Sequence, residues 1–157
     1  MAEALTRAAL AEAGVQGVTV SSAGTDAFTG DPASANARAV MRERGLDLDG
    51  HRARRVDRQV IEDADLILTM TSRHKDRLVR LVPRAIEKTF TLREFASGEK
   101  LDVSDPFGQS VESYRKTAEE LANEIARLVQ RLSLNQRQGN PPDEPSSGEQ
   151  SHGGMRL

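Results

Sequence analysis

Asp65-Leu66-Ile67-Leu68-Thr69-Met70 is the stretch that decides the fold. Its apolar residues follow one another without interruption over the length of a single strand, the pattern of a strand buried on both faces. Strands of that kind occur in parallel sheets that are covered by helices on either side. Strand and helix patterns alternate around this stretch, which indicates right-handed βαβ connections. The sequence therefore predicts an α/β fold with a parallel sheet and helices on both faces.

The remaining elements follow from their boundary residues. Further strands are expected at 18–22 and 88–92, and residues 95–104 have the composition of a polar loop. Helices are expected at 1–13, 31–44, 57–63, 72–82 and 110–132. Their predicted caps are Asp31, Asp57, Ser72 and Ser110, the residue types that accept hydrogen bonds from a first helical turn.

The last helix has the clearest apolar stripe and sets the domain boundary. Its apolar residues recur at spacings of four and three, at Tyr114, Ala118, Leu121, Ile125, Leu128 and Leu132. Beyond residue 132 the chain consists mainly of Asn, Gln, Gly, Pro, Ser and Glu, with little to bury. We expect one folded domain over residues 1–132 and a disordered polar tail over 133–157.

Composition excludes several classes of function. The sequence has 22 Lys and Arg residues and 24 Asp and Glu residues, a formal net charge of −2. No overall electrostatic field therefore attracts the protein to nucleic acid or to a membrane surface. Neither a membrane-span pattern nor a signal-peptide pattern is visible, which favours a cytoplasmic location. The sequence contains no cysteine, which excludes disulfides, thiolate metal sites and a cysteine nucleophile within these residues.

Asp105-Pro106-Phe107-Gly108 is the candidate for chemistry. The proline biases Asp105 toward an extended backbone, and Gly108 allows the turn that follows. The result is a carboxylate on a rigid loop with an aromatic ring two residues away. That arrangement suits a general acid beside a substrate-binding ring, but it also suits an ordinary Asp-Pro turn with a packed Phe107.

Five segments together resemble the low-molecular-weight protein tyrosine phosphatase family. They occur in the family's order and the resemblance covers roughly residues 1–132: Met1-Ala2-Glu3-Ala4-Leu5, Ser22-Ala23-Gly24-Thr25, Gly50-His51-Arg52-Ala53-Arg54, Ala64-Asp65-Leu66-Ile67-Leu68-Thr69-Met70 and Asp105-Pro106-Phe107-Gly108. The resemblance implies a four-stranded parallel sheet and an active-site loop of the form Cys-x5-Arg-Ser. In such a loop backbone N–H groups hold the phosphate, a thiolate attacks phosphorus and the arginine clamps phosphate oxygens.

By this resemblance Asp105 is the catalytic general acid and base, and Phe107 lines the substrate cleft. The implied partners are phosphorylated proteins, and the reaction passes through a phosphocysteine intermediate without a cofactor or a metal. Phosphotyrosine is the family's default substrate. Phosphoarginine is the second candidate substrate, because two segments resemble the bacterial protein arginine phosphatases. These segments are Asp-Pro-Phe-Gly at 105–108 and Leu-Thr-Met-Thr-x-x-His-Lys at 68–75.

Other polar residues near the predicted strand ends are expected to hold the structure around the site together. Thr69, Thr71 and His74 are expected in strand-end packing and helix capping. The segment with His51, Arg52 and Arg54 is expected to connect to the sheet by hydrogen bonds. Ser22 and Thr25 are expected to support the phosphate loop.

One departure from the family puts activity in doubt. In the family the Cys-x5-Arg-Ser loop directly precedes the segment that matches Met1, so the first central strand and the nucleophile are expected to be missing. A misplaced start codon is one explanation, and a catalytically inactive remnant that acts as a binding or regulatory module is the alternative. Loss of a central strand would leave a gap of roughly two strand spacings, about 9–10 Å, and we expect an unstable or aggregating polypeptide.

Overall fold

The computed structural model describes residues 1–138 and 155–156. Its strands are β1 (Val18–Thr19), β2 (Ile67–Thr69), β3 (Thr89–Thr91) and β4 (Met155–Arg156). They form two separate parallel pairs, β1 with β4 and β2 with β3. In the register, Val18 lies opposite Met155 and Leu68 lies opposite Phe90.

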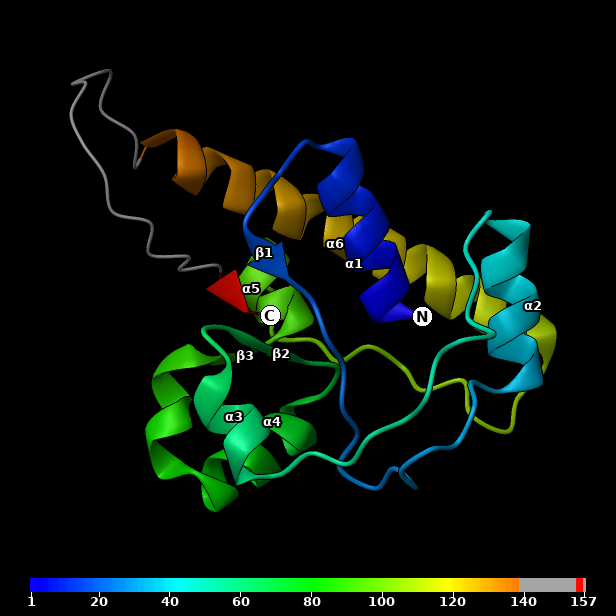
Figure 1. Ribbon diagram of the computed structural model, residues 1–157, viewed down its shortest axis with the longest axis horizontal. Coiled ribbons are helices and arrows are strands. Elements are labelled where there is room, and N and C mark those ends of the chain that lie inside the picture. Colours follow the sequence, from blue (N-terminus) through cyan, green and yellow to red (C-terminus); the bar gives the residue numbers. More distant parts are fainter. Residues whose placement is uncertain (139–154, 157) are drawn as a thin grey trace.

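Helices cover the strands on two sides (Figure 1). They are α1 (Ala2–Glu12), α2 (Ala35–Glu43), α3 (Arg58–Asp63), α4 (Ser72–Leu81), α5 (Leu92–Ser97) and α6 (Val111–Gln138), with a 3-10 helix, η1, at Pro83–Lys88. The first, second and fifth of these helices pack on α6, whereas α4 packs on β2, β3 and η1. The predicted α/β class, with a parallel arrangement of strands and helices on both faces, is confirmed.

The largest core lies under α6. All six stripe residues of that helix are buried, from Tyr114 at 5% exposed to Ala118 at 0%. They pack with Val40 and Met41 of α2 and with Leu5 and Leu10 of α1. A smaller cluster under α3 and α4 contains Ile61, Leu78, Val82 and Ala85. The 3.6-residue periodicity of the last helix therefore marked its buried face correctly.

Two predicted caps are wrong by one to three residues. Ser34, not Asp31, caps α2, because its side chain accepts the Ala37 N–H at 3.2 Å. Asp31 is held in extended chain instead, where its C=O accepts the Ala53 N–H at 2.8 Å. Thr71, not Ser72, caps α4.

The polar loop expected at 95–104 begins as helix. α5 occupies residues 92–97, and its N-terminus is a capping box in which Thr91 and Glu94 satisfy each other's backbone N–H groups. Gly98 ends the helix in the left-handed conformation, with φ of 77°.

The end of the domain also differs from the expectation. α6 continues to Gln138, so residues 133–138 are helical where a disordered tail beginning at 133 was predicted. Met155 and Arg156 form β4, which was not expected. Residues 139–154 and 157, the rest of the predicted tail, lie outside the described residues. Among the helices that the structure describes, none has the length and apolarity needed to cross a membrane.

Candidate active site

A cavity of about 800 Å³ lies between β2 and the segment that follows β1. Its apolar walls include Leu68 of β2, the preceding Leu66, and Leu121, Ile125 and Leu128 of α6. In the described part of the chain β1 and β2 belong to different sheets, so this cavity separates them. It occupies the place where the resemblance puts a further central strand, although the structure itself does not test whether one is missing.

Polar side chains gather where the two strands end. Asp105, His51, Arg54 and His74 all line the cavity, together with residues 21–25. Ligands of parallel sheets bind outside the carboxyl ends of the strands, which is where this polar mouth lies. The structure therefore brings Asp105 to the position expected of a site residue.

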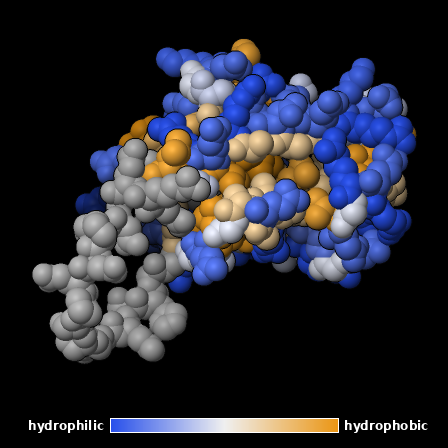
Figure 2. Space-filling model, turned by 90° about the horizontal axis from the view of Figure 1, so that it is seen from above, coloured by the Kyte–Doolittle hydropathy of each residue, from blue (hydrophilic) through white to orange (hydrophobic). Residues whose placement is uncertain are grey.

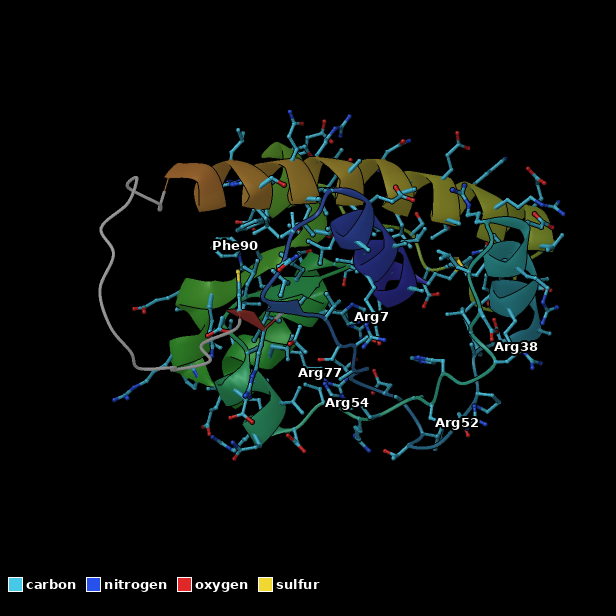
Figure 3. The ribbon with its side chains drawn as sticks, turned by 45° about the horizontal axis from the view of Figure 1, so that its top comes forward. Arg7, Arg38, Arg52, Arg54, Arg77 and Phe90 are labelled. Carbon is cyan, nitrogen blue, oxygen red and sulfur yellow. The ribbon has the colours of Figure 1, made fainter. Side chains whose placement is uncertain are left out.

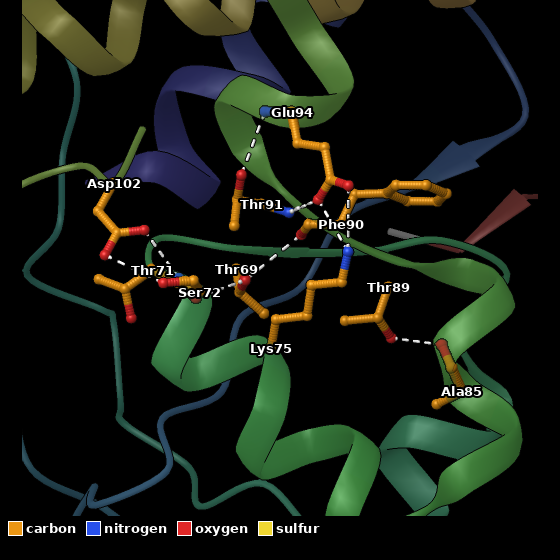
Figure 4. A network of polar contacts seen from close by, with 10 residues as sticks. All are labelled: Thr69, Thr71, Ser72, Lys75, Ala85, Thr89, Phe90, Thr91, Glu94 and Asp102. Atoms are coloured by element: carbon orange, nitrogen blue, oxygen red, sulfur yellow. Dashed lines mark hydrogen bonds and ion pairs between the residues drawn. The ribbon is translucent and has the colours of Figure 1, made fainter. Parts of the chain in front are cut away.

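The loop that carries Asp105 is anchored to the end of β2 and the start of α4. The Val103 N–H donates to the Met70 C=O at 2.8 Å, and the Val103 side chain is buried. One residue earlier, the Asp102 carboxylate accepts the Ser72 N–H at 2.8 Å, at the first turn of α4 (Figure 4). A negative charge at a helix N-terminus is favourable.

Asp105 itself is exposed at the cavity rim. Its carboxylate accepts the Phe107 N–H at 3.0 Å, and its backbone C=O accepts from the Gln109 side chain at 3.1 Å. Pro106 is buried, and Gly108 has φ of 75°, a conformation that favours glycine. The turn thus fixes the backbone of Asp105 while its carboxyl group stays accessible to solvent.

Phe107 does not join the core. Its side chain is 80% exposed, and it is not among the residues that line the cavity. The alternative of an Asp-Pro turn with a packed phenylalanine is therefore wrong. A role of the ring in substrate binding stays a prediction, because the ring lies outside the cavity on the same exposed turn as Asp105.

Two arginines hold the segment that follows β1 (Figure 3). Arg54 donates to the Ser22 C=O at 3.1 Å and to the Ser21 hydroxyl at 2.9 Å. Arg77 of α4 donates to both carboxylate oxygens of Asp26, at 2.7 and 2.8 Å. Hydrogen bonds from Arg77 lower the pKa of the Asp26 carboxyl, with a smaller contribution from Thr25. Arg54 therefore connects its segment to the residues that follow β1, not to a strand of the sheet as predicted.

The predicted capping role at the end of β2 is confirmed. The Thr71 hydroxyl accepts the His74 N–H at 3.2 Å, and the Thr69 hydroxyl donates to the Thr71 C=O at 3.0 Å. The hydroxyl of Ser22 donates to the Glu3 carboxylate of α1. Ser22 and Thr25 both line the cavity mouth, but whether they support a phosphate loop stays a prediction.

Sequence reasoning missed the polar network behind the site (Figure 4). Lys75 of α4 donates to both oxygens of Glu94, at 2.8 and 3.2 Å, and its Nζ lies 5.4 Å from the centroid of the Phe90 ring. The hydrogen bond from Lys75 is the main reason why the pKa of the Glu94 carboxyl is lowered, and the hydrogen bond from the Thr91 N–H lowers it further. The Thr91-x-x-Glu94 spacing is a capping-box signal that could have revealed the helix. The Asp102 contact has no local signal, because its partner lies 30 residues away.

This arrangement can donate a proton and hold an anion. Asp105 supplies an accessible carboxyl group, and Arg54, His51 and His74 supply cationic or hydrogen-bonding groups at the same mouth. Within the described residues no three His, Asp or Glu side chains group in a way that could hold a metal ion. The sequence contains no cysteine, so residues 1–157 contain no thiolate that could attack phosphorus.

Comparison with known proteins identifies the family. The model of the low molecular weight phosphotyrosine protein phosphatase family matches residues 1–138. A protein-arginine-phosphatase of Geobacillus stearothermophilus is 42% identical over 120 residues, which cover 76% of this chain and 80% of that protein. A probable low molecular weight protein-tyrosine-phosphatase of Ralstonia nicotianae is 32% identical over 132 residues, or 84% and 86% of the two chains.

Solved structures agree with the sequence match. The YwlE arginine phosphatase from Geobacillus stearothermophilus superposes with a TM-score of 0.82 at 38% identity, covering 90% of this chain and 91% of that one. The family match, the α/β fold and the Asp-Pro turn at the cavity mouth all point to one assignment. This chain belongs to the low molecular weight phosphotyrosine protein phosphatase family.

Proposed function

We propose that this domain is part of a protein phosphatase that removes phosphate from phosphoarginine side chains, with Asp105 as the general acid and base. The observation that carries the proposal is the accessible Asp105 carboxylate, fixed by its turn at the polar mouth of the cavity. Membership of a phosphatase family supports the reaction class.

Phosphoarginine is preferred to phosphotyrosine because of the relatives. Proteins named as arginine phosphatases are 42% and 34% identical to this chain, whereas relatives named as tyrosine phosphatases reach 32% and 35% over comparable or shorter stretches. The resemblance ranked phosphotyrosine first as the family's default substrate, and our proposal reverses that order. Phosphotyrosine remains the second substrate to test.

The chemistry assigns two proton transfers to Asp105. As a thiolate attacks phosphorus, the phosphorus–nitrogen bond to the arginine side chain breaks, and Asp105 delivers a proton to the departing nitrogen. Water then attacks the phosphocysteine, the sulfur–phosphorus bond breaks, and Asp105 accepts the proton of that water. Because residues 1–157 contain no cysteine, the thiolate of this scheme has to come from outside them. In the same proposal Phe107 contacts the substrate protein from the exposed side of the turn.

The lack of cysteine also favours a second candidate function. A domain that keeps the cavity and the Asp105 turn without a nucleophile would act as a binding or regulatory module. It would retain the anion-holding mouth and have no turnover of its own.

The DNA that precedes the Met1 codon separates these two functions. An in-frame Cys-x5-Arg-Ser segment would support the phosphatase, and a stop codon or unrelated residues there would support the binding module. The polypeptide that includes such a segment is then assayed against matched phosphoarginine and phosphotyrosine peptides. We expect faster turnover of the phosphoarginine peptide. If that polypeptide leaves both peptides intact, the phosphatase proposal is wrong.

A further inference from the structure

Arginine side chains from two other parts of the chain border the segment that follows β1. Three of them come from the extended stretch at 52–55, which forms backbone bridges with residues 24 and 32. The fourth lies on α4 and donates to the Thr25 C=O at 3.2 Å. Figure 3 shows three of these side chains in succession along one side of the molecule. We call the four residues the arginine rim: Arg52, Arg54, Arg55 and Arg77.

The arginine rim begins at the mouth of the cavity that Asp105 lines. Arg54 and residues 21–25 line the same cavity, and Arg77 reaches that segment from outside through Thr25. An extended peptide advances about 3.3 Å per residue, so residues up to three positions from a phosphorylated side chain lie within about 10 Å of it. Side chains that flank the phosphorylated residue of a substrate protein can therefore reach the arginine rim.

Most of the positive charge of the arginine rim has no carboxylate partner among the described residues. Arg54 donates to a backbone C=O and a hydroxyl group, and Arg52 donates to two backbone C=O groups. Within residues 1–138 and 155–156 the Arg55 guanidinium has neither a hydrogen bond nor a salt bridge. On the face drawn in Figure 2 hydrophilic side chains surround an apolar band, so exposed charge by itself does not mark a binding surface. The arginine rim differs because its uncompensated charges lie beside the candidate active site.

Asp26 shows how the arginine rim binds a carboxylate. Nη1 of Arg77 donates to both carboxylate oxygens of Asp26, at 2.7 and 2.8 Å. The hydrogen bonds from Arg77 are the main reason why the pKa of the Asp26 carboxyl is lowered, with smaller contributions from Thr25 and from the positive charge of Arg55. One carboxylate therefore interacts with two arginines of the rim at once. The Asp26 side chain is 73% exposed and that of Arg77 is 49% exposed, so water screens the pair and a second carboxylate can approach either arginine.

We propose that the arginine rim binds acidic side chains that flank the phosphorylated residue of a substrate protein. This inference rests on the proposed phosphatase function and adds a sequence preference to it. The contact with Asp26 favours carboxylates as ligands, and the position beside the cavity mouth favours a peptide that enters the same site. The same arginines would attract a nucleic acid, but the formal net charge of −2 gives the whole protein no such attraction. An acidic peptide is therefore the ligand to test, and RNA binding is an alternative outcome of the test.

The first test is titration of the 157-residue protein with an unphosphorylated fluorescent peptide, Glu-Asp-Ala-Arg-Ala-Asp-Glu. The matched neutral peptide has Gln and Asn at the acidic positions. We expect saturable binding of the acidic peptide that weakens as the salt concentration rises, and much weaker binding of the neutral peptide. If the protein does not stay in solution, the polypeptide that includes the Cys-x5-Arg-Ser segment takes its place. Equal binding of the two peptides, or tighter binding of a single-stranded RNA of the same length, would overturn the proposal.

Variants with opposite expected effects locate the binding. Arg55→Gln should weaken binding of the acidic peptide about two- to fivefold, the size expected for one exposed ion pair. Arg84→Gln is the matched control, because it makes the same change of charge at an exposed residue of η1 that is not among those lining the cavity. Asp26→Asn should tighten binding by a similar factor, because the charge of Arg77 is then uncompensated, whereas Glu119→Gln on α6 should leave it unchanged. Equal losses for the two arginine variants, or weaker binding by Asp26→Asn, would contradict the proposal.

Turnover separates a failure of this proposal from a failure of the phosphatase function. The polypeptide that includes the Cys-x5-Arg-Ser segment is assayed with the same two peptide sequences, each carrying phosphoarginine at its centre. We expect a lower KM for the acidic peptide at the same kcat, and Arg55→Gln should remove most of that difference. Turnover of both peptides with equal KM would refute the acidic preference and leave the phosphatase function standing. Selective binding of the acidic peptide without turnover of either would refute the phosphatase function and leave the arginine rim as the ligand site of a binding module.

Discussion

Replacing Asp102 by alanine should release the loop that positions Asp105. The Asp102 carboxylate accepts the Ser72 N–H at 2.8 Å and lies 3.4 Å from the Ser72 hydroxyl oxygen, so it caps α4 from a distant part of the chain. Loss of a helix-capping side chain costs about 1 kcal/mol in free energy of unfolding, within a range of about 0.5–2 kcal/mol. For a domain of this size, that cost lowers the melting temperature by about 2–4 °C.

A graded pair of variants separates the hydrogen bond from the charge. Asp102→Asn keeps an oxygen that can accept the Ser72 N–H but removes the negative charge at the helix N-terminus. We therefore expect its loss of stability to lie between zero and that of Asp102→Ala. Glu99→Ala is the matched control in the same loop, because the Glu99 side chain is 51% exposed and its ion-pair distance to Arg93 is 3.7 Å. Its effect should stay within about 0.5 kcal/mol.

Urea unfolding followed by circular dichroism measures these free energies. Phosphatase assays of the cysteine-containing polypeptide, which is this chain extended by an in-frame Cys-x5-Arg-Ser segment ahead of Met1, measure the consequence for Asp105. We expect the alanine variant to lose turnover as well as stability, because the loop then loses one of the two hydrogen-bonded anchors described above, Asp102 to Ser72, and keeps Val103 to Met70. If Asp102→Ala is as stable as Glu99→Ala and equally active, the anchoring role assigned to Asp102 is wrong.

Three further variants test other parts of the structure. Lys75 lowers the pKa of Glu94 in the folded state, so the folded protein binds fewer protons there than the unfolded chain, and stability falls as pH drops below the ordinary glutamate pKa of 4.5. Urea unfolding over that acid range should show a shallower loss for Glu94→Gln, and a slope equal to that of the unsubstituted protein would contradict the ion pair. Ile125→Ala should cost about 2–5 kcal/mol in free energy of unfolding, since Ile125 is 1% exposed, and a cost below about 1 kcal/mol would show that α6 is not held by its stripe. Phe107→Ala should leave the melting temperature unchanged and raise KM for peptide substrates, whereas an unchanged KM would remove the ring from the site.

The sequence predicted best what depends on local periodicity. The stripe of α6 is buried at every position that its spacing predicts. The apolar run at 66–68 was predicted to be buried on both faces, but only Leu66 is buried, whereas Ile67 and Leu68 are partly exposed and line the cavity. Helix starts were predicted less well. Asp31 has the chemistry of a cap, but its backbone is engaged by Ala53 across a loop, and no local signal announces that contact.

The candidate site was predictable in part. A motif placed Asp105 on a turn, and the structure puts that turn at the mouth of the cavity. What holds the loop was not predictable, because the contact between Asp102 and Ser72 joins segments 30 residues apart. The pairing of β4 with β1 spans an even longer separation, and a two-residue strand leaves almost no pattern. The expected instability of the polypeptide stays a prediction.

The general acid role of Asp105 is tested most directly by the leaving-group dependence of Asp105→Asn in the cysteine-containing polypeptide. Loss of a general acid typically lowers turnover by about 10²–10⁴-fold. We predict a loss of that size for a phosphoarginine peptide, whose leaving nitrogen needs a proton. The loss should be much smaller for p-nitrophenyl phosphate, whose leaving group departs as a stable anion. Equal losses for both substrates, or no loss for the peptide, would contradict the assignment of Asp105 as the proton donor.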